Sequence, residues 1–333
     1  MNVKNKLVLF VPLFLAGTLF CAEASKDLAI HNADLQRAIH FNKTEEALRL
    51  IADGFDINTP DDDGYTPLHE AAEKNNLPVI QALVAKNASI NVTDTLGWTP
   101  LHLASEGNFL TAAEFLIKQG ALVNTQTRDG FTPLHYAVRS GHILIVQLLI
   151  THGAAIESRI ESGYTPLHMA AEIEHLEIAE YLVQHNAMIN AQTDDTYHFT
   201  PLWIATSHEN LPLIQFLLNH GASTDSKATN ECAPLHLATQ NNNAAIVALL
   251  IQAHADINIQ NNEGATPLHY AARLGHIQIA RYLLSHNCDA TLTTSTGLTA
   301  FDVAYHFGPV GMEQELIEAH EEHQRLLRLM AGG

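Results

Sequence analysis

Basic residues are scarce in this 333-residue chain. Its 17 Lys and Arg face 36 Asp and Glu, which gives a formal net charge of −19 at pH 7. Such a charge repels the phosphates of nucleic acids and anionic membrane surfaces, so we expect neither as a partner. A basic protein partner is compatible with this charge, and so is the simpler interpretation that it only keeps the chain soluble.

A membrane-spanning apolar stretch is also lacking. The run 7–20 has 14 residues, fewer than the ~20 that a permanent transmembrane helix needs. Lys4 and Lys6 precede it and small residues follow it, which is typical of a secretory signal peptide cleaved after Ala24. We therefore predict that residues 1–24 are a signal peptide. The mature chain is expected to be secreted or periplasmic, without a stable membrane anchor.

Cysteine is nearly absent, which excludes a disulfide framework. Cys232 and Cys288 occupy different places in the repeats described below, so we expect them to be unpaired. The third cysteine, Cys21, allows a second interpretation of the N-terminus as a lipid-attachment site. Phe20 disfavours that interpretation, because such sites normally have a small residue before the cysteine.

Signatures of catalysis are missing as well. The chain contains no nucleophile elbow, glycine-rich phosphate loop or Cys-x-x-Cys pair. Residues 34–330 are filled by repeats, which leaves no separate segment to house an active site. We therefore predict that the protein is not an enzyme and has no cofactor. An enzyme subunit stays as a less favoured alternative.

One phrase is present again and again. DGYTPLHEAA at 63–72 returns as DGFTPLHYAV at 129–138 and SGYTPLHMAA at 162–171, and the step is 33 residues everywhere except for one step of 35. The Thr of the phrase, or its replacement, stands at Thr66, Thr99, Thr132, Thr165, Thr200, Ala233, Thr266 and Thr299. A degenerate ninth copy precedes these at 34–58. A period of this length indicates a solenoid of stacked units.

The period predicts the boundaries of the units. After the signal peptide at 1–24 we expect a degenerate N-terminal capping repeat at 30–62, full repeats at 63–95, 96–128, 129–161, 162–196, 197–229, 230–262 and 263–295, and a C-terminal capping repeat with a long final helix at 296–330.

Each copy predicts a pair of short helices. The hydroxyl of Thr66 can cap a first helix, and Pro67 suits its first turn. The segment 77–86 then carries apolar residues at spacings of three and four, as an amphipathic second helix does. Polar turn residues follow and predict a short β-hairpin loop. Stacked copies bury each other's apolar faces, so we predict an all-α solenoid of helix-turn-helix repeats with short β-hairpin loops.

The motif Thr-Pro-Leu-His-x-Ala at this step resembles the ankyrin repeat family. Intact TPLH quartets begin at Thr66, Thr99, Thr132, Thr165 and Thr266, and the variants TPLW and APLH stand at 200–203 and 233–236. The resemblance covers nearly the whole chain after the signal peptide. It implies a protein-binding module, and it does not name the partner.

Two departures from the repeat carry information. The copy with the longer step has two extra residues within 194–203, which we expect to bulge from a hairpin loop. In the last copy Pro309 and Gly311 delay the second helix, which then runs on unusually far. We interpret that helix as a polar cap with its Glu and His side chains facing outward. A partner-binding helix is the alternative interpretation.

Histidine is abundant, with 21 copies. Six of them share one place in the first helix: His69, His102, His135, His168, His236 and His269. The resemblance implies that they hydrogen-bond neighbouring turns. Equivalent residues of stacked helices lie ~8–10 Å apart, too far to share a metal ion, so we expect no metal site. His320 and His323, on one face of the last helix, are a weak alternative.

The residue before the Thr-Pro pair is aromatic in five successive repeats. These residues are Tyr65, Trp98, Phe131, Tyr164 and Phe199. The resemblance implies that this place, with the outer end of the first helix, lines the concave face that most often binds partners. Nearby carboxylates predict an acidic rim made of Asp62, Asp63, Glu73, Glu106, Glu161 and Glu172. The alternative is that each ring packs against a neighbouring loop and is structural.

These features together predict an exported, monomeric scaffold or inhibitor that binds another protein. A bacterial effector that captures a host protein is the main alternative, because its binding chemistry would be the same.

Overall fold

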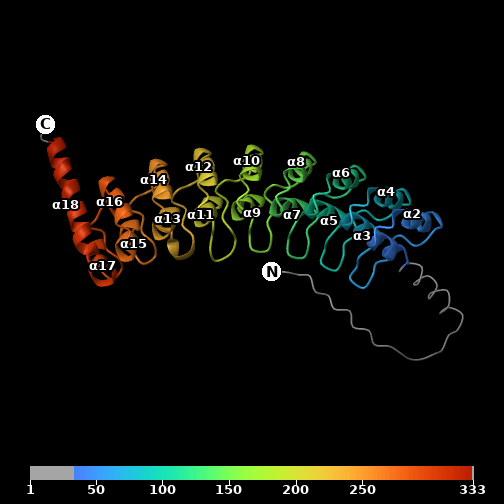
Figure 1. The fold of residues 1–333 in the computed structure, drawn as a ribbon, viewed down its shortest axis with the longest axis horizontal. Helices are drawn as coiled ribbons and strands as arrows, with labels where there is room; N and C mark the ends of the chain where they lie inside the picture. The colour runs from blue at the N-terminus through green and yellow to red at the C-terminus, as the bar shows by residue number, and fades with distance from the viewer. Residues whose placement is uncertain (1–33, 332–333) are drawn as a thin grey trace, which may run out of the picture.

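The computed structural model describes residues 34–331, so the predicted signal peptide lies outside the described residues. The described chain is a series of helix pairs set side by side in one elongated row, from α2 at one end to α18 at the other (Figure 1). The first helices of the pairs form one layer and the second helices another, while the long loops project to one side (Figure 1). The prediction of an all-α solenoid is confirmed.

The helix lengths repeat almost without variation. Residues 34–40 are helical, and α2 spans Thr44–Ala52. The pairs that follow are α3 (Pro67–Glu73) with α4 (Leu77–Ala85), α5 (Pro100–Glu106) with α6 (Leu110–Lys118), α7 (Pro133–Arg139) with α8 (Ile143–Thr151), α9 (Pro166–Glu172) with α10 (Leu176–Gln184), α11 (Pro201–Ser207) with α12 (Leu211–Asn219), α13 (Pro234–Gln240) with α14 (Ala244–Gln252), α15 (Pro267–Leu274) with α16 (Ile277–Ser285), and α17 (Ala300–Phe307) with α18 (Met312–Ala331). A short 3-10 turn, η1, lies at Thr229–Glu231.

The Thr-Pro pair starts the first helices as expected. Thr99 caps α5 in an extended conformation, and its hydroxyl oxygen accepts from the backbone N–H of His102 at 3.4 Å. In return, Nδ1 of His102 accepts from the backbone N–H of Thr99 at 3.0 Å. This reciprocal pair satisfies two donors that the start of the helix would otherwise leave open. Pro100, without an N–H, fits the first helical position.

The buried faces also follow the repeat. Leu68 of α3 and Leu83 of α4 are fully buried, and so is Leu134 in the middle of the array. The buried residues of successive repeats belong to one apolar cluster, so the interior continues along the whole row. Cys232 and Cys288 are both unpaired, as predicted.

The loops are tighter than the expected β-hairpins. Each is closed by a backbone hydrogen bond from its first N–H to its last carbonyl oxygen, such as Asp94 N–H to the Trp98 carbonyl oxygen at 2.9 Å. Several also bond to the loop before them, as Thr95 N–H does to the Asp63 carbonyl oxygen at 2.9 Å. Across residues 34–331 the structure has no strand, and a single isolated antiparallel bridge joins Thr293 to Thr299. The arms are too short for a ladder, since each loop turns back within a few residues.

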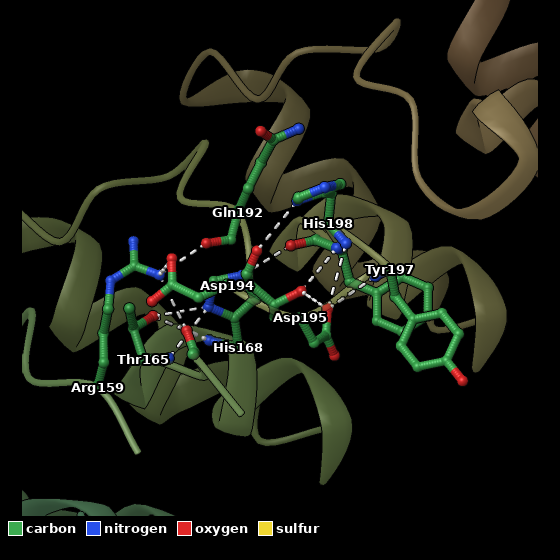
Figure 2. A network of polar contacts seen from close by, with 11 residues as sticks. Arg159, Thr165, His168, Gln192, Asp194, Asp195, Tyr197 and His198 are labelled. Atoms are coloured by element: carbon green, nitrogen blue, oxygen red, sulfur yellow. Dashed lines mark hydrogen bonds and ion pairs between the residues drawn. The ribbon is translucent and has the colours of Figure 1, made fainter. Parts of the chain in front are cut away.

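The two extra residues do bulge from a loop, as predicted. The loop 193–199 is closed by a hydrogen bond of 3.0 Å between its first N–H and its last carbonyl oxygen, while the helices on either side keep their usual lengths. Asp195 organises the bulge by accepting from the backbone N–H of Tyr197 at 3.0 Å (Figure 2). Arg159 of the preceding loop lies 3.1 Å from Asp194 and ties the bulge to its neighbour (Figure 2).

The final helix α18 is long, as predicted, but its histidines do not face outward. His320 lies against the ring of Phe301 at 5.8 Å, and Nε2 of His323 lies 3.0 Å from Oδ1 of Asn287. Both histidines fall four residues after buried positions of the helix, Leu316 and Ala319, and therefore share its inner face. The glutamates do point to solvent, as at positions 315, 318, 321 and 322. None of the helices within residues 34–331 has the combination of length and apolar character that a bilayer crossing requires.

Candidate functional site

The six recurrent histidines each reach a backbone carbonyl of the following loop, and in three of them that carbonyl belongs to an aromatic position. Nε2 of His102 lies 3.2 Å from the carbonyl oxygen of Phe131, the aromatic residue of the next repeat, and His168 makes the same contact with Phe199 at 3.0 Å. Nδ1 is meanwhile engaged with the capping Thr. Both ring nitrogens are therefore occupied by hydrogen bonds, which confirms the structural role that the resemblance implied.

Burial also keeps these histidines neutral. It lowers the pKa of His102, His135, His168 and His236 to about 4, and it lowers the pKa of His69 and His269 as well. No group of three or more potential metal ligands occurs in the described part of the chain.

The five predicted aromatic residues are all half-buried at the junction between a loop and a first helix. They do not form one uninterrupted stack: a further ring bridges two of them, and another packs against a third. The ring of Tyr136 lies 4.1 Å from Trp98 and 5.2 Å from Phe131. The ring of Trp203 lies 4.3 Å from Phe199. We call the surface made by the five predicted aromatic residues together with Tyr136 and Trp203 the ladder surface.

Sequence reasoning missed Tyr136 and Trp203, although a signal for both was present. Tyr136 is the variable residue of Thr-Pro-Leu-His-x-Ala, and Trp203 replaces the histidine of that motif. Trp203 also takes over the histidine's task, since its indole N–H donates to the carbonyl oxygen of Cys232 at 3.3 Å. An aromatic residue at the histidine or at the variable position of the motif is therefore the sequence signal that would have added both residues to the predicted surface.

The predicted acidic rim is uneven. Glu73 and Glu106 lie at the ends of neighbouring first helices, and Glu106 is 3.1 Å from Arg139. Glu172 lies 3.6 Å from His208. Glu161 is exposed beside Phe131 in a shallow hollow of about 430 Å³. Asp62 is exposed at a loop tip and lines none of the pockets at this surface.

A larger pocket gathers several of the predicted residues. It has a volume of about 600 Å³ and lies between Tyr65 and Trp98, and we call it the Tyr65–Trp98 pocket. Five of its lining residues are carboxylates, of which three were predicted and two, at positions 61 and 94, were not: Asp61, Asp63, Glu73, Asp94 and Glu106. Leu103 and Phe109 complete the apolar part of its wall. A pocket of this size can receive a side chain or a short segment of a partner.

The negative charge reaches the aromatic wall. The pKa of Tyr65 is raised far above its usual value, first by burial of the ring and then by the charges of Glu73 and Asp94. The field in this pocket therefore disfavours any further negative charge.

Two protein-family models match the sequence of this chain. One, described as ankyrin repeats (3 copies), matches residues 88–160, 156–228, 202–294 and 235–324, and the other, described as ankyrin repeats (many copies), matches residues 50–104. The chain belongs to the ankyrin repeat family. A search of the curated proteins found no match. Ankyrin repeats imply a protein–protein interaction module, and such scaffolds are typically not enzymes.

The later ankyrin repeats present a different surface. Where the aromatic residue is replaced by Cys232, the hydroxyl of Tyr270 lies 3.5 Å from the sulfur and accepts from Asn261 at 3.1 Å. A pocket of about 460 Å³ lies beside Ala265 and Leu298, the residues at this place in the last two copies. The aromatic character of the ladder surface is therefore concentrated in the first five full ankyrin repeats.

Proposed function

We propose that this ankyrin repeat chain is an exported scaffold or inhibitor that binds one protein partner on its ladder surface. The observation that carries the proposal is the row of half-exposed rings, which stands beside carboxylates in the same five repeats. Neither catalysis nor a cofactor is needed for this function. The acidic surroundings favour a partner with a basic contact surface and disfavour nucleic acid.

The dimensions of the ladder surface support a partner-binding role. Four intervals of ~8–10 Å give a length of roughly 35 Å, enough for a helix or an extended segment to lie along it. Five half-covered rings supply about 400–600 Å² of contact area. A standard interface uses ~800 Å² on each side, so the rings would form its centre and the polar rim the remainder.

Affinity capture with the purified array, followed by mass spectrometry and measurement of Kd for each captured protein, tests the binding proposal. We expect the double variant Phe131→Ala/Tyr164→Ala to lose capture of the true partner. Leu144→Ala is the matched control, because Leu144 is an exposed apolar residue of α8, on the layer of second helices. A partner that binds both variants equally well would overturn the proposed surface.

Export is tested separately by measuring the mass of the protein isolated from its natural host. Loss of residues 1–24 is the expected result. An intact Met1 or a lipid on Cys21 would contradict the signal peptide. The place where the mature protein accumulates separates the two functions. Retention in a periplasm or release into the medium supports an exported scaffold, and presence inside host cells supports an effector.

A further inference from the structure

We propose that the Tyr65–Trp98 pocket is a binding site for an arginine side chain. The inference rests on the proposed function, because it names the group by which a protein partner would anchor itself at one end of the ladder surface.

The charge of the pocket is entirely of one sign. Its lining contains five carboxylates and no Lys, Arg or His. Two of the carboxylates are fixed by the backbone: Oδ1 of Asp61 accepts from the N–H of Tyr65 at 2.8 Å, and Oδ1 of Asp94 accepts from the N–H of Trp98 at 2.8 Å. The aromatic residue and the carboxylate of each loop are thereby held together. A cation entering the pocket meets two carboxylates that are already held in place, while Glu106 also pairs with Arg139 at 3.1 Å and Glu73 lies 3.8 Å from Lys74.

The walls suit a planar cation better than a compact one. Tyr65 and Trp98 each expose part of a ring, and Leu103 with Phe109 adds apolar surface. A guanidinium group can stack on an aromatic face while its N–H groups bond to a carboxylate in pairs. An ammonium group is a compact, strongly hydrated charge and gains less from such walls. The combination therefore favours arginine over lysine.

One repeat further along, the chain itself contains a related arrangement of an arginine beside rings and a carboxylate. The guanidinium of Arg139 lies 4.7 Å from the ring centre of Tyr136 and 5.4 Å from that of Phe131, and it is 3.1 Å from Glu106. Arg139 ends α7 at the place where Glu106 ends α5. One repeat earlier, Trp98 stands at the place of Phe131 and Glu73 at the place of Glu106, while Leu103 replaces Tyr136 and Glu106 replaces Arg139. An arginine from outside the chain would meet a ring and a carboxylate at the places where Arg139 meets Phe131 and Glu106.

The two tryptophans of the chain allow a direct test. In a Trp203→Phe background, Trp98 is the only tryptophan, and its fluorescence reports on the pocket. The probes are the capped tripeptides acetyl-Gly-Arg-Gly-amide, its lysine analogue and its citrulline analogue. We expect a saturable change in emission with the arginine peptide, weaker binding of the lysine peptide, and none with citrulline, which has the shape of arginine without its charge.

Two test variants and one control variant locate the binding. Glu73→Gln should weaken the arginine peptide by about tenfold, as expected for the loss of a hydrogen bond to a charged group. Glu172→Gln, at the same place three repeats later, is the matched control and should leave this affinity unchanged. Glu106→Arg should abolish binding by supplying an internal guanidinium, as Arg139 does in the next interval. Circular dichroism of each variant checks that the fold is retained.

The outcomes separate this inference from the proposed function. Equal responses to all three peptides, or an unchanged affinity in Glu73→Gln, would overturn the arginine site. If Phe131→Ala/Tyr164→Ala abolishes partner capture while no arginine peptide binds, the proposed function stands and the inference fails. If the arginine peptide binds as expected while partner capture is insensitive to the ladder variants, the pocket stands and the proposed ladder surface fails.

Discussion

His69 Nε2 lies 3.0 Å from the backbone carbonyl oxygen of Trp98, one repeat further along the chain. The same ring's Nδ1 accepts from the backbone N–H of Thr66 at 3.1 Å. One side chain therefore caps its own helix and holds the aromatic residue of the following repeat. The positions of Trp98, Phe131 and Phe199 on the ladder surface each depend on a buried, neutral histidine in the repeat before them.

Stability should fall as the pH drops below neutrality. Burial lowers the pKa of His102 and three equivalent histidines to about 4, whereas a histidine in the unfolded chain titrates near ~6.5. The unfolded state therefore takes up protons first, and the stabilisation present above about pH 6.5 is lost as the pH falls towards 4. Between pH 7 and 5.5 we expect a loss of about 1 kcal/mol in the free energy of unfolding per buried histidine.

Urea denaturation at the two pH values measures this loss. His102→Gln should reduce the pH dependence by the share of one histidine, while the exposed His286→Gln should leave it unchanged. A free energy of unfolding that stays constant or rises between pH 7 and 5.5 would contradict the role assigned to the histidines.

Glu157→Asn should stabilise the protein. Other repeats have asparagine here, and Asn124 donates to the carbonyl oxygen of Gly153 at 3.0 Å while accepting from the N–H of Ala155 at 2.7 Å. Oε1 of Glu157 accepts from Met188 N–H at 2.8 Å, but its Oε2 is buried with no hydrogen-bond partner within residues 34–331. Restoring the amide donor should raise the free energy of unfolding by about 1 kcal/mol.

Thermal and urea melts of Glu157→Asn test this prediction, together with melts of the reverse substitution at the equivalent position, Asn124→Glu. Asn124→Glu should lower stability by a comparable amount. A loss of stability in Glu157→Asn would show that the carboxylate is satisfied in solution, for example by bound water.

Leu134→Ala should lower the free energy of unfolding by ~2–5 kcal/mol. The side chain of Leu134 is fully buried between repeats, and the shortened residue would leave a cavity there. Leu298, by contrast, lies partly exposed at the end of a loop, so Leu298→Ala should cost far less. Equal losses in denaturant melts of the two variants would mean that the inner and outer positions are wrongly assigned.

On the ladder surface, Trp98→Ala and Phe131→Ala should each weaken partner binding by ~2 kcal/mol or more. Both rings are half-exposed, so folding should survive. Changes at Cys232 and Ala265, the same place in later repeats, should matter little. Surface plasmon resonance of the four variants gives the answer. Intact affinity in the two aromatic variants, with loss at the later positions, would place the partner site toward the C-terminal end.

Most of the local structure was predictable, because it depends on neighbours in sequence. Thr66 and Pro67 specify a helix start by capping and by a restricted φ, and the spacing of Ile80 and Leu83 specifies the buried face of the second helix. Neither feature needs information from another repeat.

The candidate site was predictable only in part. Its aromatic positions follow from the repeat, but the contact of Tyr136 with Trp98 and the place of Arg139 over two rings depend on how neighbouring repeats stack. The prediction that the last histidines face outward was wrong for the same reason. His320 and His323 look like polar surface residues in the sequence, yet the register of α18 turns them toward Phe301 and Asn287.

The period, the helix pairs and the row of aromatic residues follow from the amino-acid sequence alone, because helix caps, turns and amphipathic spacing are encoded within single 33-residue copies. Only the packing of the repeats shows which rings touch, which carboxylates meet in the Tyr65–Trp98 pocket and which rings Arg139 covers. Those relations join side chains from different repeats. They depend on the offset between stacked units, which is set by packing of the shared core rather than by any one copy of the phrase.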